Sequence, residues 1–136
     1  MGYKTFKSKP KMIGDQPVTN RVKADFLEST LMKVDGLIIN RTVISSSYDL
    51  RFTSYFIGVD TQSATGSITI NLPSASGSVA GRTFLIKDEM GNCNNNNIVL
   101  QPSGSDTVDG QSSITIDSPY ASLNLYTDGL SRWFIY

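Results

Sequence analysis

From about residue 53 onward, the chain is a series of short segments in which apolar and polar side chains alternate. The segment "GSITINLP" is typical, because Ile68, Ile70 and Leu72 alternate with hydroxyl and amide side chains. A period of two residues is that of a β-strand, whose successive side chains point to opposite faces of the sheet. Similar segments follow at "GRTFLIKD", "NIVLQP", "SSITID", "ASLNLYT" and "SRWFIY", with Gly, Pro, Ser and Asn between them. This spacing predicts an all-β fold, a small sandwich or barrel of mostly antiparallel strands shaped like a jelly-roll knob.

Residues 1–23 are interpreted as an extended basic arm, in which Pro10 and Pro17 exclude a long helix. The arm has six basic residues and one acidic residue, whereas the remaining 113 residues have six basic and eleven acidic ones. A basic arm on an acidic body is expected to dock on nucleic acid or on an acidic protein surface, and a solvated tail is the alternative. The residues assigned to anchoring are Lys4, Phe6, Lys7, Lys9, Lys11, Arg21 and Lys23.

Residues 24–52 are interpreted as a transition segment. Its first part, "ADFLESTLMK", has the length of two helical turns and is too short to be stable without packing partners. The next part turns at Asp35-Gly36 and becomes extended, with an apolar run that has no second layer nearby in the sequence. We therefore expect residues 24–58 to join subunits in an intertwined trimer. The residues predicted to be buried in that interface are Leu27, Leu31, Leu37, Ile39, Val43 and Ile44.

Residues 53–136 are assigned to the β-knob. The chain ends in "WFIY", four residues whose fraying would expose a large aromatic surface. We therefore expect this end of the chain to be held in a sheet.

The stretch "GNCNNNN", residues 91–97, contains the only cysteine, Cys93, and the chain has no histidine. A reactive thiolate needs a basic or cationic neighbour, and a zinc site needs several thiol or imidazole ligands. Asn tolerates left-handed backbone angles and caps turns with its own amide. We therefore interpret this stretch as the loop of a hairpin between "RTFLIKD" and "NIVLQP", and we expect no catalytic residue.

The acidic residues do not form a recognisable metal site. Asp88 and Glu89 are neighbours in a predicted strand and should point to opposite faces. Asp106 and Asp109 could add oxygen ligands for calcium, but the EF-hand spacing is absent and solvated loop acids are the ordinary explanation. We expect no metal and no cofactor. The N-terminal region lacks an apolar signal core, and no stretch has the length of a membrane span, so a membrane partner is not expected.

The chain from residue 55 to residue 136 resembles a β-module found near the C-termini of bacteriophage and giant-virus fibre and decoration proteins. The resemblance is carried by an "I-x-L-P-x-A" motif, a "G-R-x-F-x-I-K-D" motif, an "N-N-I-x-L-x-P" motif and a "Y-x-S-L-x-L-Y-T-D-G…W" motif. In this chain they stand at 70–75, 81–88, 96–102 and 120–133. The similarity implies a homotrimer with the knob at the end of a stalk, and it implies that the asparagine-rich loop is structural.

The short chain and its basic arm favour a capsid decoration, that is, a cement protein, head fibre or spike anchored on the major capsid protein. Such a protein is located in the virion and is assembled in the host cytoplasm without a signal peptide. The alternative is the receptor-binding tip of a short tail fibre, which would contact host glycans through Tyr120, Tyr126 and Arg132. Nucleic acid is a less favoured partner for the arm. An enzymatic function is the least favoured of these hypotheses.

Overall fold

The structure is a computed structural model, and it describes residues 12–13, 16–17, 29–31, 33 and 35–136. The chain divides into two compact units, Met1–Gly36 and Leu37–Tyr136. In the first unit, β1 (Met12–Ile13) pairs antiparallel with β2 (Gln16–Pro17). All seven residues predicted to anchor the arm, and Leu27, lie outside the described residues. Of the predicted helical turns, the described positions 29–31 and 33 are not helical.

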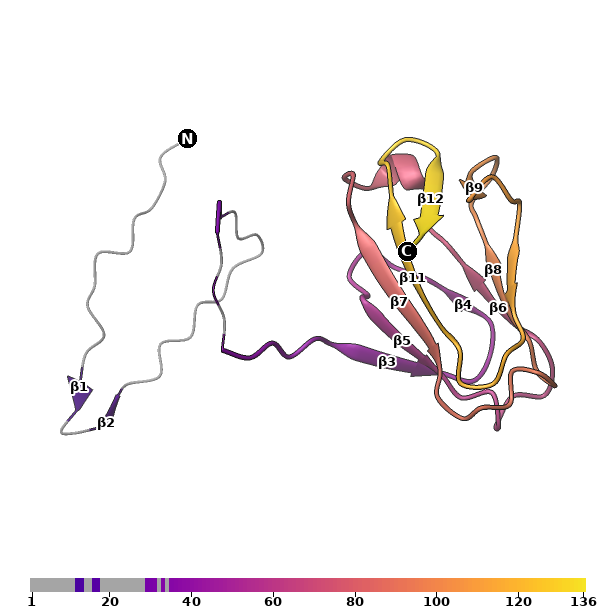
Figure 1. Ribbon diagram of the computed structural model, residues 1–136, viewed down its shortest axis with the longest axis horizontal. Helices are drawn as coiled ribbons and strands as arrows, with labels where there is room; N and C mark the ends of the chain where they lie inside the picture. The colour runs from indigo at the N-terminus through magenta and orange to yellow at the C-terminus, as the bar shows by residue number, and fades with distance from the viewer. Residues whose placement is uncertain (1–11, 14–15, 18–28, 32, 34) are drawn as a thin grey trace. The chain divides into compact units, whose positions relative to one another are not determined.

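The second unit contains two β-sheets (Figure 1). In spatial order, the six-stranded sheet consists of β3 (Arg41–Ile44), β5 (Phe56–Val59), β7 (Thr83–Asp88), β11 (Ser122–Thr127), β12 (Arg132–Ile135) and β9 (Thr107–Val108). The four-stranded sheet consists of β10 (Ile114–Ile116), β8 (Ile98–Gln101), β6 (Ile68–Asn71) and β4 (Tyr48–Asp49). Within residues 35–136, the helical structure is a single 3₁₀ turn, η1 (Ala75–Gly77). The predicted all-β class is therefore confirmed.

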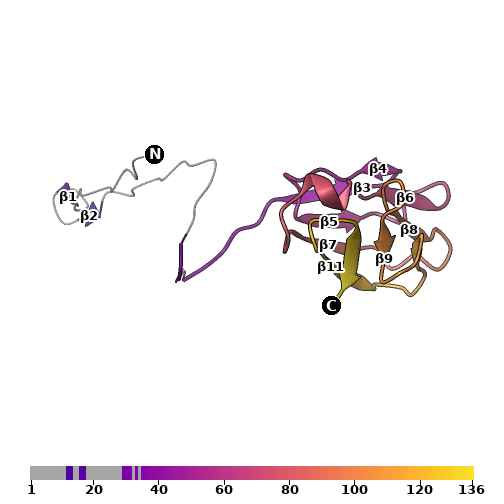
Figure 2. The same ribbon diagram turned by 90° about the horizontal axis from the view of Figure 1, so that it is seen from above.

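The prediction of mostly antiparallel strands is wrong, because both sheets are mixed. Strand β5 runs parallel to its neighbours β3 and β7, and β6 runs parallel to β4 and β8. The cause is the route of the chain, which alternates between the two sheets at every strand from β3 to β11 (Figures 1 and 2). From β3 to β8, after two crossings the chain returns beside the strand that it left, in the same direction. Antiparallel pairing occurs mainly around β11, whose neighbours are β7 and β12, and between β8 and β10.

The same route corrects the expected hairpin at the asparagine-rich stretch. The strand before it, β7, belongs to the six-stranded sheet, and the strand after it, β8, belongs to the four-stranded sheet. Residues 89–97 are therefore a connection between sheets. The expectation that this stretch is a turn holds, but the two strands that it joins are not paired with each other.

One hydrophobic core contains side chains from both sheets. The alternation in the sequence predicts the core residues of this segment correctly. Ile68, Ile70 and Leu72 are buried, and the polar residues between them are not. Of the other residues expected to point inward, Phe84, Ile86, Ile98, Leu100, Ile116 and Leu125 are buried, and Ile114 and Leu123 are partly buried against the core. Full burial of an aliphatic or aromatic side chain contributes roughly 1.5–3 kcal/mol. This core is therefore the main source of stability of the Leu37–Tyr136 unit.

The C-terminal segment is held in a sheet, as predicted. Trp133 is fully buried and packs on Phe84, with 5.3 Å between the ring centroids. The backbone N–H of Tyr136 donates to the carbonyl oxygen of Asn124. The predicted start of the knob at residue 53 is late, because β3 and β4 already belong to its two sheets and the compact unit begins at Leu37.

Candidate functional site

The most connected polar group in the described residues is the carboxylate of Asp88, at the end of β7. The side chain is fully buried, and its Oδ1 accepts a hydrogen bond from Thr61 Oγ1 at 2.7 Å. The backbone N–H groups of Met90 and Gly91 donate to the same oxygen, at 3.2 and 3.0 Å. The other oxygen, Oδ2, accepts from the backbone N–H groups of Cys93 (3.3 Å) and Tyr120 (3.1 Å). One carboxylate thus fixes three loops at one end of the knob.

Thr61 extends this network to the asparagines. Its hydroxyl accepts from the N–H of Asn92, and its carbonyl oxygen accepts from the side-chain amides of Asn92 and Asn96. The amide of Asn96 also donates to Ala64, and that of Asn95 donates to Asn92. The asparagine-rich loop is therefore held by its own amides against the loop that contains Thr61.

The environment of Asp88 keeps the carboxylate ionised. Burial alone would raise its pKa, but the hydrogen bonds from Thr61, Tyr120 and Cys93 outweigh burial and lower the pKa to about 2. A carboxylate with five donors and so low a pKa is a poor general base and cannot act as an acid near neutral pH. The chemistry of this cluster is that of a structural clamp.

Cys93 is fully buried within the same cluster, and its thiol donates to the carbonyl oxygen of Ser118 at 2.9 Å. Burial, followed by the nearby carboxylate of Asp88, raises the pKa of the thiol to about 11. Because the thiolate is the nucleophilic form, this thiol is inert.

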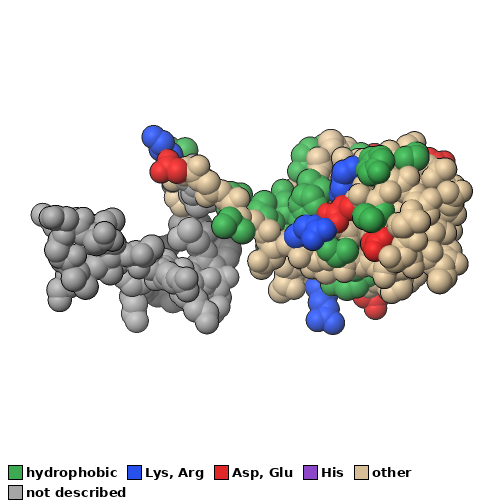
Figure 3. All heavy atoms as spheres, turned by 90° about the horizontal axis from the view of Figure 1, so that it is seen from below, with side chains coloured by type: hydrophobic (Ala, Val, Ile, Leu, Met, Phe, Trp, Pro, Cys, Tyr) green, Lys and Arg blue, Asp and Glu red, His purple; other side chains and the backbone are tan. Residues whose placement is uncertain are grey.

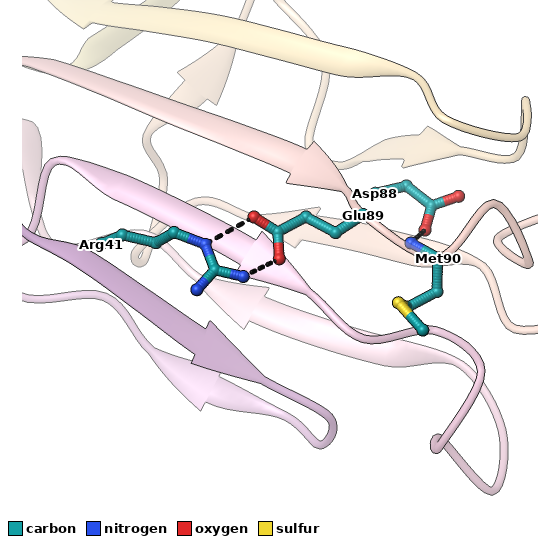
Figure 4. A network of polar contacts seen from close by, with 4 residues as sticks. All are labelled: Arg41, Asp88, Glu89 and Met90. Carbon is teal, nitrogen blue, oxygen red and sulfur yellow. Dashed lines mark hydrogen bonds and ion pairs between the residues drawn. The ribbon is translucent and has the colours of Figure 1, made fainter.

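A second polar group lies on the outer side of the six-stranded sheet (Figure 4). Arg41 on β3 and Glu89 after β7 form a two-point ion pair, with Nε donating to Oε1 at 2.7 Å and Nη2 donating to Oε2. Between them lies Gly58 on β5, where a Cβ would collide with the Glu89 carboxyl group. Figure 4 shows that Asp88 and Glu89 point in different directions, as expected for neighbours in a strand.

Tyr120 is presented by the clamp at the loop end of the knob. Its backbone has a left-handed φ of 61°, an uncommon angle for a bulky residue. Its carbonyl oxygen accepts from Lys87 Nζ, and its ring lies so close to Gly91 that a Cβ there would collide with the ring. The side chain is nevertheless 62% exposed. The backbone of Tyr120 is therefore held by these hydrogen bonds, and its exposed ring lies against Gly91.

The residues predicted to contact glycans do not form one site. Tyr126 pairs with Thr83 at the start of β7, whereas Tyr120 lies beside Asp88 at the other end of that strand. Arg132 is exposed on β12, on the same side of the sheet as Tyr126. Tyr126 and Arg132 thus share a face, and Tyr120 is apart from them.

The residues predicted to form the trimer interface differ in exposure. Leu31, Leu37, Ile39 and Val43 are exposed in the single chain. The prediction that Ile44 lies in the trimer interface is wrong, because Ile44 is buried in the core of its own subunit and is not available to a partner. Sequence reasoning missed Ile38, which is 98% exposed. The consecutive aliphatic letters of "LIIN" were the signal that could have found it.

The surface also contains an open pocket of about 200 Å³. It is lined by the hydroxyl residues Ser45, Ser46, Ser47, Thr65 and Ser67, together with Gly66 and Ile68. Its lining contains no acidic or basic side chain, so the pocket offers hydrogen bonds and no acid–base chemistry. Among the described residues, no three acidic, cysteine or histidine side chains are grouped to hold a metal ion. No helix in that part of the chain is long and apolar enough to cross a membrane.

No protein-family model and no curated protein sequence matches the chain.

Proposed function

We propose that the chain is a non-enzymatic structural protein of a virion, a homotrimeric decoration of the capsid. In this proposal the two sheets pack as a sandwich-like knob, and residues 1–23 form the arm that anchors the knob on the major capsid protein. Residues around the start of the knob join the three subunits. The resemblance of residues 55–136 to viral fibre and decoration modules supports the virion assignment.

The observation that carries the proposal is the exposed aliphatic run before β3. Leu37 is 68% exposed and Ile38 is 98% exposed, and Val43 on β3 is also exposed. β3 is the edge strand of its sheet, and an exposed apolar edge is a place where another chain is expected to pair or pack. A protein whose function is assembly needs such a surface. An enzyme of this fold would need a group of reactive side chains, and the most connected polar cluster described here is a clamp.

The test is co-sedimentation of the full-length protein with capsid shells of the virus whose genome encodes it. Full-length protein should pellet with the shells, and a variant lacking residues 1–23 should stay in the supernatant while remaining trimeric. Equal pelleting of both proteins would overturn the role of the arm, and pelleting of neither would overturn the capsid assignment. Because the arm is basic, the same pair should also be compared for salt-dependent binding to DNA, which is the competing explanation of its charge.

A second candidate is a receptor-binding tip, which the geometry of Tyr120 favours. An exposed ring that lies against Gly91, on a backbone held by Asp88 and Lys87, is suited to stacking on a sugar ring with a reduced loss of side-chain freedom. Glycan binding by the full-length protein that is lost in Tyr120→Ala and kept in Tyr136→Ala would favour this candidate. Absence of binding to a panel of host-surface glycans would remove it.

A further inference from the structure

The outer face of the six-stranded sheet is apolar at positions where a face in contact with water would be polar. Strand register shows which residues share this face, because they alternate with the fully buried Ile57, Ile86, Leu125 and Trp133. We name it the aromatic face and define it by Val43, Phe56, Leu85, Tyr126, Phe134 and Tyr136. Tyr126 stacks on Phe134 with 5.1 Å between centroids, and Tyr136 meets Tyr126 edge-on at 5.7 Å. None of the six packs against the hydrophobic core.

The four-stranded sheet provides an internal comparison. Its outward positions are mainly polar, and include Asp49, Asn71, Gln101 and Thr115. Two of these side chains hydrogen-bond to each other, Asn71 to Asp49 at 2.7 Å, and Gln101 donates to the carbonyl oxygen of Ser112. Figure 3 agrees with this contrast. Hydrophobic and charged side chains are concentrated toward the side where Figure 1 places β3, β5 and β7, and the opposite side is mostly uncharged polar groups.

Two of the three basic side chains on this side of the sheet are engaged within the chain, and the third, Arg132 on β12, is exposed. Arg41 is paired with Glu89, and Lys87 donates to the carbonyl oxygen of Tyr120. One exposed arginine on an otherwise apolar face is a poor match to an acidic protein or a nucleic acid, each of which is bound through several basic groups. The face matches better an uncharged apolar segment, which needs no charged partner.

The same chain also carries the segment that would complement this face. The aliphatic run Leu37–Ile39 leads directly into β3 at the edge of the sheet, and its three side chains are exposed. Within one subunit, the run and the aromatic face are two apolar surfaces in contact with water. In an assembly of copies, the run of one subunit and the face of the next cover each other, which removes both from water.

We propose that the aromatic face is the surface on which a second copy of this chain docks, with the neighbouring copy's Leu37–Ile39 run against Tyr126 and Phe134. This inference rests on the proposed function, because it assigns the subunit contact of that assembly. It adds a contact surface that lies within the strands of the knob, beyond the segment preceding them.

The test is site-specific photo-crosslinking in the full-length protein. The photoreactive amino acid p-benzoylphenylalanine replaces Tyr126 on the aromatic face or, as the matched control, Thr115 on the outer face of the other sheet. After irradiation, the protein with the probe at 126 should give covalent dimers on a denaturing gel, and the protein with the probe at 115 should give none. Peptide mapping should place the partner attachment in residues 37–39.

Charge substitution provides the second measurement. Tyr126→Lys should weaken self-association by at least about tenfold, the effect expected for an aromatic residue at the centre of an interface. Thr115→Lys should leave it unchanged, and fluorescence of the buried Trp133 reports whether each variant is folded. If the protein is oligomeric but neither probe cross-links and neither lysine matters, this inference fails and the proposed function stands. If the unmodified protein is a monomer, both fail.

Discussion

The carboxylate of Glu89 lies directly over Gly58 and forms a two-point ion pair with the guanidinium of Arg41. The pair ties the end of β7 to the edge strand β3 across β5. The absence of a side chain at position 58 permits this close approach, since a Cβ would occupy the place of the carboxyl group. The exposed Arg41–Glu89 ion pair therefore links the outer surface of the sheet to its edge strand, β3.

The first prediction concerns Gly58→Ala. The displaced group is the far end of a flexible side chain and the ion pair is exposed, so we expect a loss of about 1 kcal/mol or less. In a Glu89→Ala background the same substitution should be neutral or stabilising by about 0.5 kcal/mol, because alanine loses less backbone entropy than glycine. A double-mutant cycle of urea unfolding curves measures this coupling. An identical cost of Gly58→Ala in both backgrounds would show that Glu89 is not the group displaced.

Asp88→Asn tests the clamp. The carboxylate accepts five hydrogen bonds, and an amide has a single acceptor oxygen, so buried N–H groups would lose their partners. We expect a loss of about 3 kcal/mol in the free energy of unfolding. Asp117→Asn is the matched control at an exposed position nearby, with an expected change within about 0.5 kcal/mol. Equal effects of the two substitutions would contradict the role assigned to Asp88.

Acid titration tests the same group through its pKa. The pKa of Asp88 is about 2 in the folded chain and lies near its ordinary value of 3.8 in the unfolded chain. The stability contributed by this carboxylate is therefore fully present above about pH 5 and is lost as the pH falls toward 2. The expected loss is on the order of 2 kcal/mol. Urea unfolding at a series of pH values should show this acid limb, and the limb should be shallower in Asp88→Asn.

Cys93 should be unreactive in the folded protein. Burial and the neighbouring Asp88 raise the pKa of its thiol to about 11, so almost no thiolate exists at pH 8. A colourimetric thiol reagent should detect no cysteine in the native protein and one per chain after unfolding in urea. Rapid reaction of the native protein would contradict the burial of this thiol and the inert role assigned to it.

The alternation of Ile68, Ile70 and Leu72 predicts the core correctly, because a period of two specifies which side of a strand is buried. Alternation does not specify which strands become neighbours. Short loops favour hairpins, but here they connect strands of different sheets, and this route produces parallel pairs such as β5 with β7. The sheet to which each strand belongs is decided by packing between strands distant in the sequence, which a local pattern does not contain.

The clamp illustrates a similar limit. The asparagine-rich stretch indicates a turn, because Asn and Gly favour turn conformations. Its organising residues, Asp88 and Thr61, are 27 positions apart in the chain. Asp88 gave a local signal, since it is an acidic residue at the end of an apolar strand, three positions before the glycine of a Gly-Asn turn. Thr61 gave none, since its role depends on the meeting of two loops.

The most direct test of the assembly is the native mass of the full-length protein, measured by light scattering after gel filtration. Each chain has a mass of 14.9 kDa. We predict a trimer of about 45 kDa, the mass of a closed three-fold assembly, and we expect that mass not to fall on dilution through the micromolar range. A stable species of the mass of one chain would contradict it, because the exposed run Leu37–Ile39 and the aromatic face would then remain uncovered.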